Sequence, residues 1–112
     1  VGQALPTDAL ALMRSRYSAV ARQLPAYLVQ TTHRKNPSYD PNVKRWVASW
    51  QQYCQQTTCQ GLTIVAFDPG ETEAMVHFVA GLQQGDKFFR LEEKSRFVKL
   101  NKRWLYLDGE LL

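Results

Sequence analysis

The chain has 112 residues, of which 45% are hydrophobic and 21% are charged, and its formal net charge is +4. This composition is typical of one globular domain over residues 1–112, and it excludes a disordered or fibrous protein. The basic residues form no run longer than two, and no apolar stretch approaches the roughly 18 residues of a membrane span, which argues against a nucleic-acid binder and a membrane protein.

Three helices are expected in the first half of the chain, over residues 10–24, 26–31 and 42–56. Residues 1–6 are expected to form a tail before them. Thr7 is a suitable N-cap for the first helix, and Asp8 is favourably placed in its first turn. Pro25 either ends the first helix or starts the second. The loop before the third helix contains two prolines, which excludes regular structure there.

Four strands are expected in the second half, over residues 62–67, 73–82, 87–100 and 103–108. Their connections are short, as in hairpins, so the sheet is expected to be antiparallel. The apolar face of this sheet needs a cover, and the three helices are the only elements that can provide it. The sequence therefore predicts a single α+β domain in which the helices pack in the concave face of a curved four-stranded antiparallel sheet.

The two cysteines, Cys54 and Cys59, define no metal site, since a single C-x₄-C pair cannot supply four zinc ligands. Cys54 continues the apolar stripe of Trp46 and Trp50 and is expected to be a buried thiol. A disulfide between the two cysteines would require close Cα atoms and stays open. No nucleophile elbow, phosphate loop, zinc-protease helix or dinucleotide fingerprint is present, so no catalytic residue, metal or cofactor is assigned.

Several short blocks carry a family resemblance. They are residues 12–19 (LMRSRYSA), 27–28 (YL), 32–33 (TH), 61–64 (GLTI), 93–97 (EKSRF) and 104–109 (WLYLDG). In this order they resemble the central domain of the YchJ family of SEC-C-motif proteins, a member of the nuclear transport factor 2-like superfamily. The resemblance covers nearly the whole chain, and it implies a cone-shaped fold in which helices pack inside a strongly bent sheet.

The resemblance leaves the function open, because the superfamily includes enzymes, small-molecule binders and modules that dimerise or dock partners. Members of the YchJ family often carry cysteine-rich zinc motifs beside this domain. Neither end of this chain has one, and zinc binding is therefore not carried over. The loop over residues 31–37 resembles the form in plant and algal versions, which implies a plastid location. Otherwise the protein is expected to be intracellular and cytoplasmic.

Strand alternation identifies polar side chains expected on the concave face. Glu93 and Ser95 alternate with the apolar residues of the third strand. In the fourth strand Trp104, Tyr106 and Asp108 share one face. Both faces of that strand are partly apolar, and it is the resemblance that favours these three residues on the concave side.

The first helix and the loop contribute further candidates. Arg14 and Tyr17 are three residues apart and share a helix face, whereas Arg16 lies about 100° or more away. Either arginine could form a buried ion pair with Glu93 or Asp108, and such a pair would serve the architecture rather than chemistry. His33 follows the second helix, where it could cap the helix end or face the mouth of the cone as an acid or base.

One hypothesis is a non-catalytic binding module. The cone would hold a small apolar or acidic ligand, or a protein partner would dock on the outer sheet face. A homodimer could also form through that face, where Leu105 and Leu107 would supply an apolar patch. No sequence spacing forces two carboxylates, or a histidine and a carboxylate, together, and this favours binding over catalysis.

The alternative is a small-molecule enzyme of the proton-transfer or hydrolytic kind, with Glu93 or Asp108 as the base. Tyr17, Tyr106 or His33 would then donate hydrogen bonds. An open cavity lined by both Glu93 and Asp108, with an unpaired carboxylate, would favour this hypothesis. A filled core in which arginine locks both carboxylates would exclude it.

Overall fold

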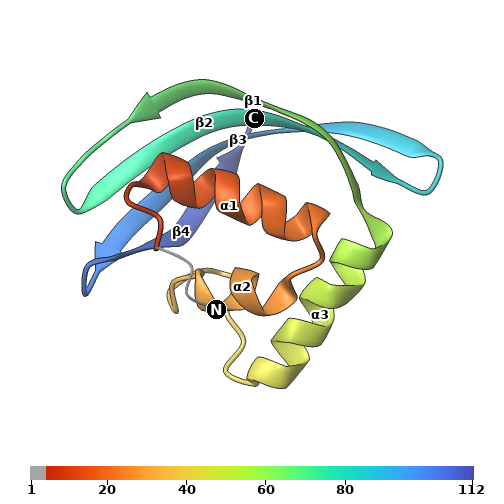
Figure 1. Ribbon diagram of the computed structural model, residues 1–112, viewed down its shortest axis with the longest axis horizontal. Helices are drawn as coiled ribbons and strands as arrows, with labels where there is room; N and C mark the ends of the chain where they lie inside the picture. The colour runs from red at the N-terminus through yellow and green to blue at the C-terminus, as the bar shows by residue number, and fades with distance from the viewer. Residues whose placement is uncertain (1–4) are drawn as a thin grey trace.

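The computed structural model describes residues 5–112 and shows three helices followed by one four-stranded antiparallel sheet (Figure 1). Part of the expected tail, residues 1–4, lies outside the described residues. The elements are α1 (Ala9–Ala21), α2 (Pro25–Gln30), α3 (Val43–Gln56), β1 (Thr58–Asp68), β2 (Glu73–Gln84), β3 (Lys87–Leu100) and β4 (Arg103–Leu111). The predicted α+β class and the predicted number of elements are confirmed.

The helix boundaries follow from local capping. Asp8, rather than the expected Thr7, is the N-cap of α1, since its Oδ1 accepts a hydrogen bond of 2.7 Å from the Ala11 N–H. The helix ends at Ala21, earlier than expected, because Gln23 adopts a left-handed conformation with φ of 56° that closes the helix. Asn42 caps α3. Within residues 5–112 no helix is long and apolar enough to cross a bilayer.

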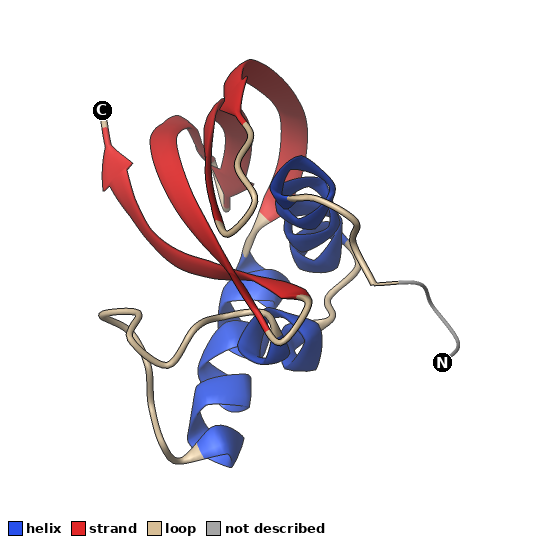
Figure 2. Ribbon diagram, turned by 90° about the vertical axis from the view of Figure 1, so that its left-hand side faces the viewer, coloured by secondary structure: helices blue, strands red, loops and turns tan. Residues whose placement is uncertain are grey.

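The sheet is a meander in the order β1-β2-β3-β4, and it bends around the helices (Figures 1 and 2). Strand β3 has the expected bounds, whereas β1 starts earlier than expected and is irregular near Gln60 and Val65. Irregularities of this kind increase the local twist and bend of a strand. The sheet therefore closes over the helices as a cone rather than lying flat against them.

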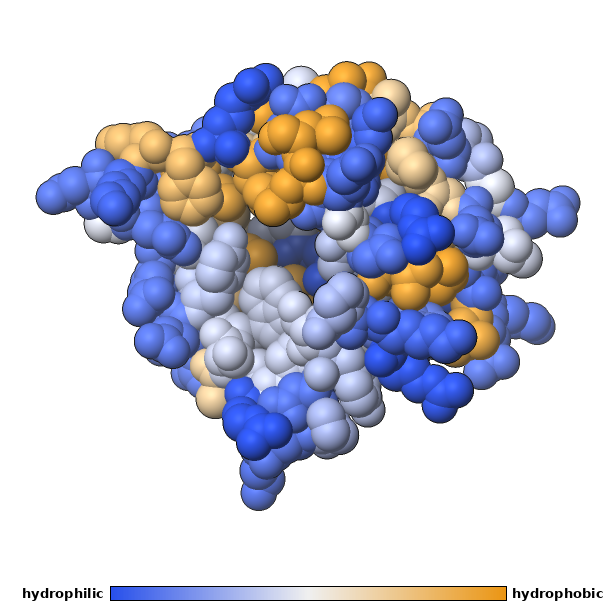
Figure 3. All heavy atoms as spheres, turned by 180° about the vertical axis from the view of Figure 1, so that it is seen from behind, coloured by the Kyte–Doolittle hydropathy of each residue, from blue (hydrophilic) through white to orange (hydrophobic). Residues whose placement is uncertain are grey.

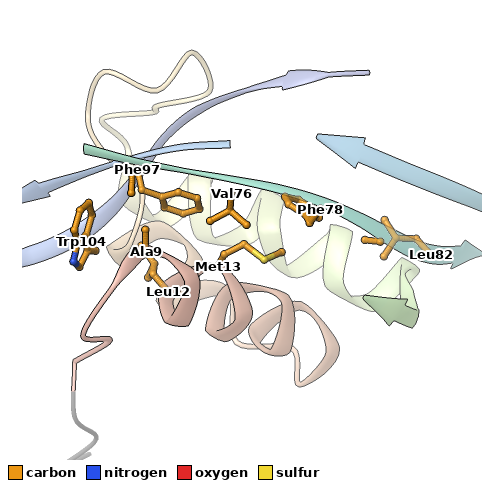
Figure 4. Packing of buried hydrophobic residues seen from close by; sticks show 10 residues of the cluster. Ala9, Leu12, Met13, Val76, Phe78, Leu82, Phe97 and Trp104 are labelled. Carbon is orange, nitrogen blue, oxygen red and sulfur yellow. The ribbon is translucent and has the colours of Figure 1, made fainter. Parts of the chain in front are cut away.

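The main core lies between α1 and the concave face of the sheet (Figure 4). Leu12 and Met13 of α1 pack against Val76 of β2, Phe97 of β3 and Trp104 of β4. Full burial of each large apolar side chain stabilises the fold by about 1.5–3 kcal/mol.

A smaller cluster of Ala19, Leu28 and Cys54 joins the three helices to one another. Cys54 is buried as expected, and Cys59 on β1 is half-buried. Both thiols are free, and burial raises the pKa of each, so both stay protonated at neutral pH. Of the three helices, α1 makes most of the contacts with the sheet, and α2 and α3 are attached to the sheet partly through α1.

Candidate functional site

A hollow of about 300 Å³ lies beside the main core and is lined by residues of the three helices and of the concave face of the sheet. It is visible as a depression with polar and apolar atoms inside it on the face shown in Figure 3. Its volume lies at the small end of the range for pockets that bind organic ligands. Much of its wall is aromatic, with contributions from Trp46, Trp50 and Tyr53 of α3, Phe78 of β2, Phe97 of β3 and Tyr106 of β4.

The polar part of the hollow is centred on Glu93. Its neighbour on the same face of β3, Ser95, donates a hydrogen bond to Glu93 Oε2, and the Tyr106 hydroxyl donates to the same oxygen at 3.0 Å. The other oxygen, Oε1, has no hydrogen-bond partner in the described part of the chain. Every buried polar side-chain atom of residues 5–112 has a hydrogen-bond partner. Because Oε1 has none, it is not buried and remains accessible to solvent.

Gly109 makes room for this carboxylate. It pairs with Ser95 across β3 and β4, and a Cβ atom at Gly109 would overlap the Glu93 carboxylate. Any larger residue would therefore displace the Glu93 side chain. The geometry of the polar group thus depends on both strands.

Tyr106 connects Glu93 to an arginine. Burial, the charge of Glu93 and the hydrogen bond to it all raise the pKa of Tyr106, so its hydroxyl stays protonated and remains a donor. The guanidinium carbon of Arg16 lies 4.8 Å from the centroid of the Tyr106 ring, within range of a cation–π interaction. One phenol ring therefore contacts a carboxylate through its hydroxyl and a cation through its face.

Arg16 also fixes the end of α2. Its Nη1 donates to Leu28 O at 3.0 Å, Thr31 Oγ1 at 2.7 Å and Thr32 Oγ1 at 3.1 Å. Burial lowers the pKa of Arg16 to about 10, which still leaves it charged at neutral pH. The expected ion pair between an α1 arginine and an inward carboxylate is wrong for the described residues, since no ion pair there joins α1 to the sheet. Arg14 is exposed to solvent.

Tyr17 lines the hollow, as its position on α1 suggested, but its hydroxyl is engaged by the backbone. It donates to Gly61 O at 2.8 Å and accepts from Gly61 N–H at 2.9 Å. These two bonds hold α1 to an irregular part of β1. Partial burial raises the pKa of Tyr17, and the phenol therefore stays neutral. Tyr17 is a structural residue at the edge of the site.

The structure places Asp108 on the convex face of the sheet, which corrects its expected place beside Tyr106. Tyr106 pairs with Phe97 and Asp108 pairs with Arg96, so Leu107 is an extra residue in β4. This bulge shifts the alternation, and the side chain after it points to the other face. There Asp108 accepts two hydrogen bonds from Arg96, of 2.8 and 2.7 Å, which lower the pKa of the carboxyl.

Trp104 and His33 also lie outside the hollow. Trp104 is buried in the main core, with the Lys99 ammonium 5.9 Å from its ring centroid. The His33 N–H donates to Tyr106 O, and its Nδ1 accepts from Lys35 N–H at 3.0 Å. His33 thus neither caps α2, whose C-cap is Thr31, nor lines the hollow.

The loop between α2 and α3 contributes residues that sequence reasoning missed. Asn36 lines the hollow and donates through Nδ2 to Leu107 O at 2.8 Å, the carbonyl of the bulged residue. Thr31 O accepts from Tyr106 N–H at 2.8 Å. Together these bonds fasten the loop to β4. Because the acceptor carbonyl depends on an unforeseen bulge, no sequence signal marks Asn36 as a contact of this strand.

Comparison with known proteins identifies relatives of the chain. The family model for the YchJ middle NTF2-like domain matches residues 8–109. A UPF0225 protein from Pectobacterium carotovorum is 40% identical over 103 residues, which cover 88% of this chain and 63% of that protein. One from Bordetella pertussis is 38% identical over 108 residues, covering 93% of this chain and 72% of the relative. The chain thus spans less than two thirds of the Pectobacterium protein.

Solved structures give the same result. The solution structure of a SEC-C motif protein from Rhodopseudomonas palustris has a TM-score of 0.78 at 25% identity, covering 97% of this chain and 82% of its own. A crystal structure of a SEC-C motif protein from Psychrobacter arcticus has a TM-score of 0.74 at 29% identity, covering 99% and 65%. An NTF-2 like protein of unknown function from Shewanella oneidensis has a TM-score of 0.69 at 13% identity, covering 91% and 93%, and shows the shared fold alone.

Proposed function

The chain belongs to the YchJ family, in which it corresponds to the middle NTF2-like domain, and we propose that its hollow binds a small organic ligand without catalysing a reaction. One observation carries the proposal. An open hollow of about 300 Å³ with an aromatic wall contains Glu93, whose Oε1 is accessible and unpartnered among residues 5–112. An apolar pocket with a few convergent polar groups is the usual form of a ligand site.

A binding role is favoured over catalysis because the hollow offers one carboxylate and lacks the partners expected for it. General acid–base chemistry needs a positioned group within reach of the reacting proton, and usually a second group of opposite role. Asp108 lies on the other face with Arg96, and His33 lies outside the hollow. An enzyme that uses Glu93 alone is the alternative. Turnover of a bound compound that Glu93→Gln abolishes would favour that alternative.

The three tryptophans provide a direct test of the proposed site. Trp46 and Trp50 line the hollow, whereas Trp104 does not. In NMR spectra of the ¹⁵N-labelled protein, fragments that bind in the hollow are expected to shift the indole N–H signals of Trp46 and Trp50 and leave that of Trp104 unchanged. Trp→Phe variants assign the three signals. A fragment screen in which none shifts the two signals would overturn the proposal.

A matched pair of variants tests where the fragments bind. Ala80 lines the hollow on β2, and Ala80→Leu is expected to fill part of it and weaken binding. Ala66 is exposed on the convex face of β1, so Ala66→Leu adds the same side chain elsewhere and should leave binding unchanged. Equal binding by both variants would place the ligand outside the hollow.

Docking of a second copy or of a protein partner on the convex face stays a prediction from the sequence. Leu105 and Leu107 are half-buried and therefore expose only part of an apolar patch. The convex face also carries an ion pair between Arg96 and Asp108. Sedimentation equilibrium over a wide range of protein concentrations tests for self-association. The plastid compartment also stays a prediction.

A further inference from the structure

The group formed by Glu93, Ser95 and Tyr106 can accept hydrogen bonds from a ligand but has no hydroxyl proton left to donate. The hydroxyl protons of Ser95 and Tyr106 are both directed at Glu93 Oε2. What remains for a ligand is Glu93 Oε1, which carries negative charge, and the second lone pair of the Tyr106 hydroxyl. A group that binds here must bring donors, and an ammonium group brings three of them together with the complementary charge.

Arg16, which lies over the face of the Tyr106 ring, offers hydrogen-bond donors and a positive charge. All of its hydrogen bonds are made by Nη1, so Nε and Nη2 have no partner within residues 5–112, and neither atom is sealed from solvent. Nε and Nη2 form one edge of a planar guanidinium, the geometry that binds a carboxylate through two parallel hydrogen bonds. The cation–π contact with Tyr106 and the three hydrogen bonds of Nη1 hold the guanidinium in place.

The two charges lie close to each other without forming an ion pair. Arg16 lies over the face of the Tyr106 ring, and Glu93 binds its hydroxyl. A ligand with a single charge would meet a like charge beside its partner, which selects against it. A ligand that carries an ammonium and a carboxylate group on one carbon atom could satisfy Arg16 and Glu93 together.

The rest of the hollow indicates what such a ligand carries besides its charges. Trp50, Tyr53 and Phe78 line it with aromatic surface, and its volume of about 300 Å³ limits the ligand to a small molecule. Flat apolar groups pack well against such walls. We propose that the hollow binds a free α-amino acid with an aromatic or large apolar side chain, its ammonium group on Glu93 and its carboxylate on the Nε–Nη2 edge of Arg16.

This inference rests on the proposed binding function, and three matched probes separate the two. L-Phenylalanine carries both charges, phenethylamine lacks the carboxylate, and 3-phenylpropionate lacks the ammonium group. Titration followed by the indole signals of Trp46 and Trp50 is expected to show that L-phenylalanine binds at least about tenfold more tightly than either probe, since each probe lacks one charged contact. Equal or tighter binding of a singly charged probe would overturn the amino-acid assignment.

The failures are distinguishable. If neutral or singly charged fragments shift the two tryptophan signals and amino acids do not, the ligand class is wrong and the binding function stands. If no compound shifts them, both proposals fall.

Two carboxylate variants provide the residue-level test. Glu93→Gln keeps the size of the side chain but removes its charge, and it is expected to reduce binding of L-phenylalanine about tenfold while binding of 3-phenylpropionate is unchanged or improved. Asp108→Asn makes the same change on the convex face and should alter neither. Thermal unfolding of both variants checks that they fold. Unchanged L-phenylalanine binding by folded Glu93→Gln would contradict the assignment.

Discussion

Glu93 and Asp108 lie on paired strands and differ in the face of the sheet that they occupy. Asp108 is on the convex face, where Arg96 neutralises it through two hydrogen bonds. Glu93 is on the concave face, where two neutral hydroxyl groups bind one of its oxygens and no cation lies within ion-pair distance among the described residues. The first carboxylate is fully matched within the protein. The second keeps a net charge and a free oxygen at an open hollow.

The comparison shows that the partner of a carboxylate, and not the carboxylate alone, indicates whether it can bind a ligand. A surface carboxylate paired with arginine contributes little to stability and offers nothing to a ligand. A carboxylate held by hydroxyl groups is oriented without being neutralised, so its charge remains available for recognition. The same distinction between the concave and convex faces can be tested with neighbouring residues of one strand.

The largest expected effect is on Trp104 of β4. Trp104→Ala should lower the free energy of unfolding by about 3–5 kcal/mol, because the side chain is buried in the main core and its removal leaves a cavity. Leu105 is half-buried and faces the other side, so Leu105→Ala should cost clearly less. Urea denaturation of both variants measures the difference. Equal costs would contradict the assignment of faces in β4.

A smaller effect is expected for the two arginines of α1. Arg16→Met should destabilise the protein by about 1–3 kcal/mol, because the hydroxyls of Thr31 and Thr32 lose the guanidinium as donor and Leu28 O loses one of its donors. Arg14 is exposed, and Arg14→Met should change stability by no more than about 0.5 kcal/mol. Thermal unfolding of the pair provides the measurement. A larger loss of stability for Arg14→Met than for Arg16→Met would mean that Arg14, and not Arg16, points inward.

The Tyr106 side chain contacts both Glu93 and Arg16. Tyr106→Phe removes the hydroxyl that binds Glu93 and should lower the free energy of unfolding by about 1–2 kcal/mol, as expected for the loss of a hydrogen bond to a charged group. The pKa of Tyr106 is raised in the folded state, so the folded protein holds this proton after the unfolded chain has lost it. Its contribution to stability is complete below about pH 10, the ordinary value for tyrosine, and is lost as the pH rises above it.

Alkaline titration checks this prediction. In wild-type protein the tyrosinate absorbance of Tyr106 should appear above the ordinary pKa of tyrosine, and Tyr106→Phe should remove part of this late change. Tyr17 and Tyr53 also have raised pKa values and contribute the remainder. A late change of unaltered size in Tyr106→Phe would show that its hydroxyl is not buried against Glu93.

Much of the fold could be predicted from the sequence because its signals are local. Alternating residues and hairpin-length connections predicted the strands, and β3 has the bounds that were expected. The bent, cone-like arrangement came from the family resemblance, since the bend depends on irregularities that alternation does not reveal. Leu107 shows this limit. One extra residue in β4 sent Asp108 to the opposite face, and a period of two cannot indicate where it breaks.

The site was only partly predictable for a related reason. Glu93 and Ser95 follow from alternation in the third strand, whereas the family resemblance placed Tyr106 on the same face. The choice between Arg14 and Arg16 depends on how α2 docks, because Thr31 and Thr32 supply the acceptors. The spacing of Trp46 and Trp50 identified an apolar stripe on the third helix but did not show that both residues line the hollow. Whether aromatic residues meet or leave space is decided by packing between elements and not by helical spacing.

The smallest expected effect concerns the convex pair and completes the comparison. Arg96 lowers the pKa of Asp108 in the folded state, so the pair stabilises the protein above the ordinary carboxyl value of about 4. This contribution is lost as the pH falls through the lowered folded pKa. Because both side chains are partly exposed, Asp108→Asn should cost no more than about 1 kcal/mol at neutral pH.

Unfolding measured at neutral pH and below pH 4, with and without added salt, tests this, since salt screens a partly exposed ion pair. The variant should lose a small part of the acid dependence of wild type while ligand binding in the hollow is unaffected. If Asp108→Asn instead weakened binding as much as Glu93→Gln does, the two faces of the sheet would be coupled. The assignment of a structural role to Asp108 and of a ligand-binding role to Glu93 would then be wrong.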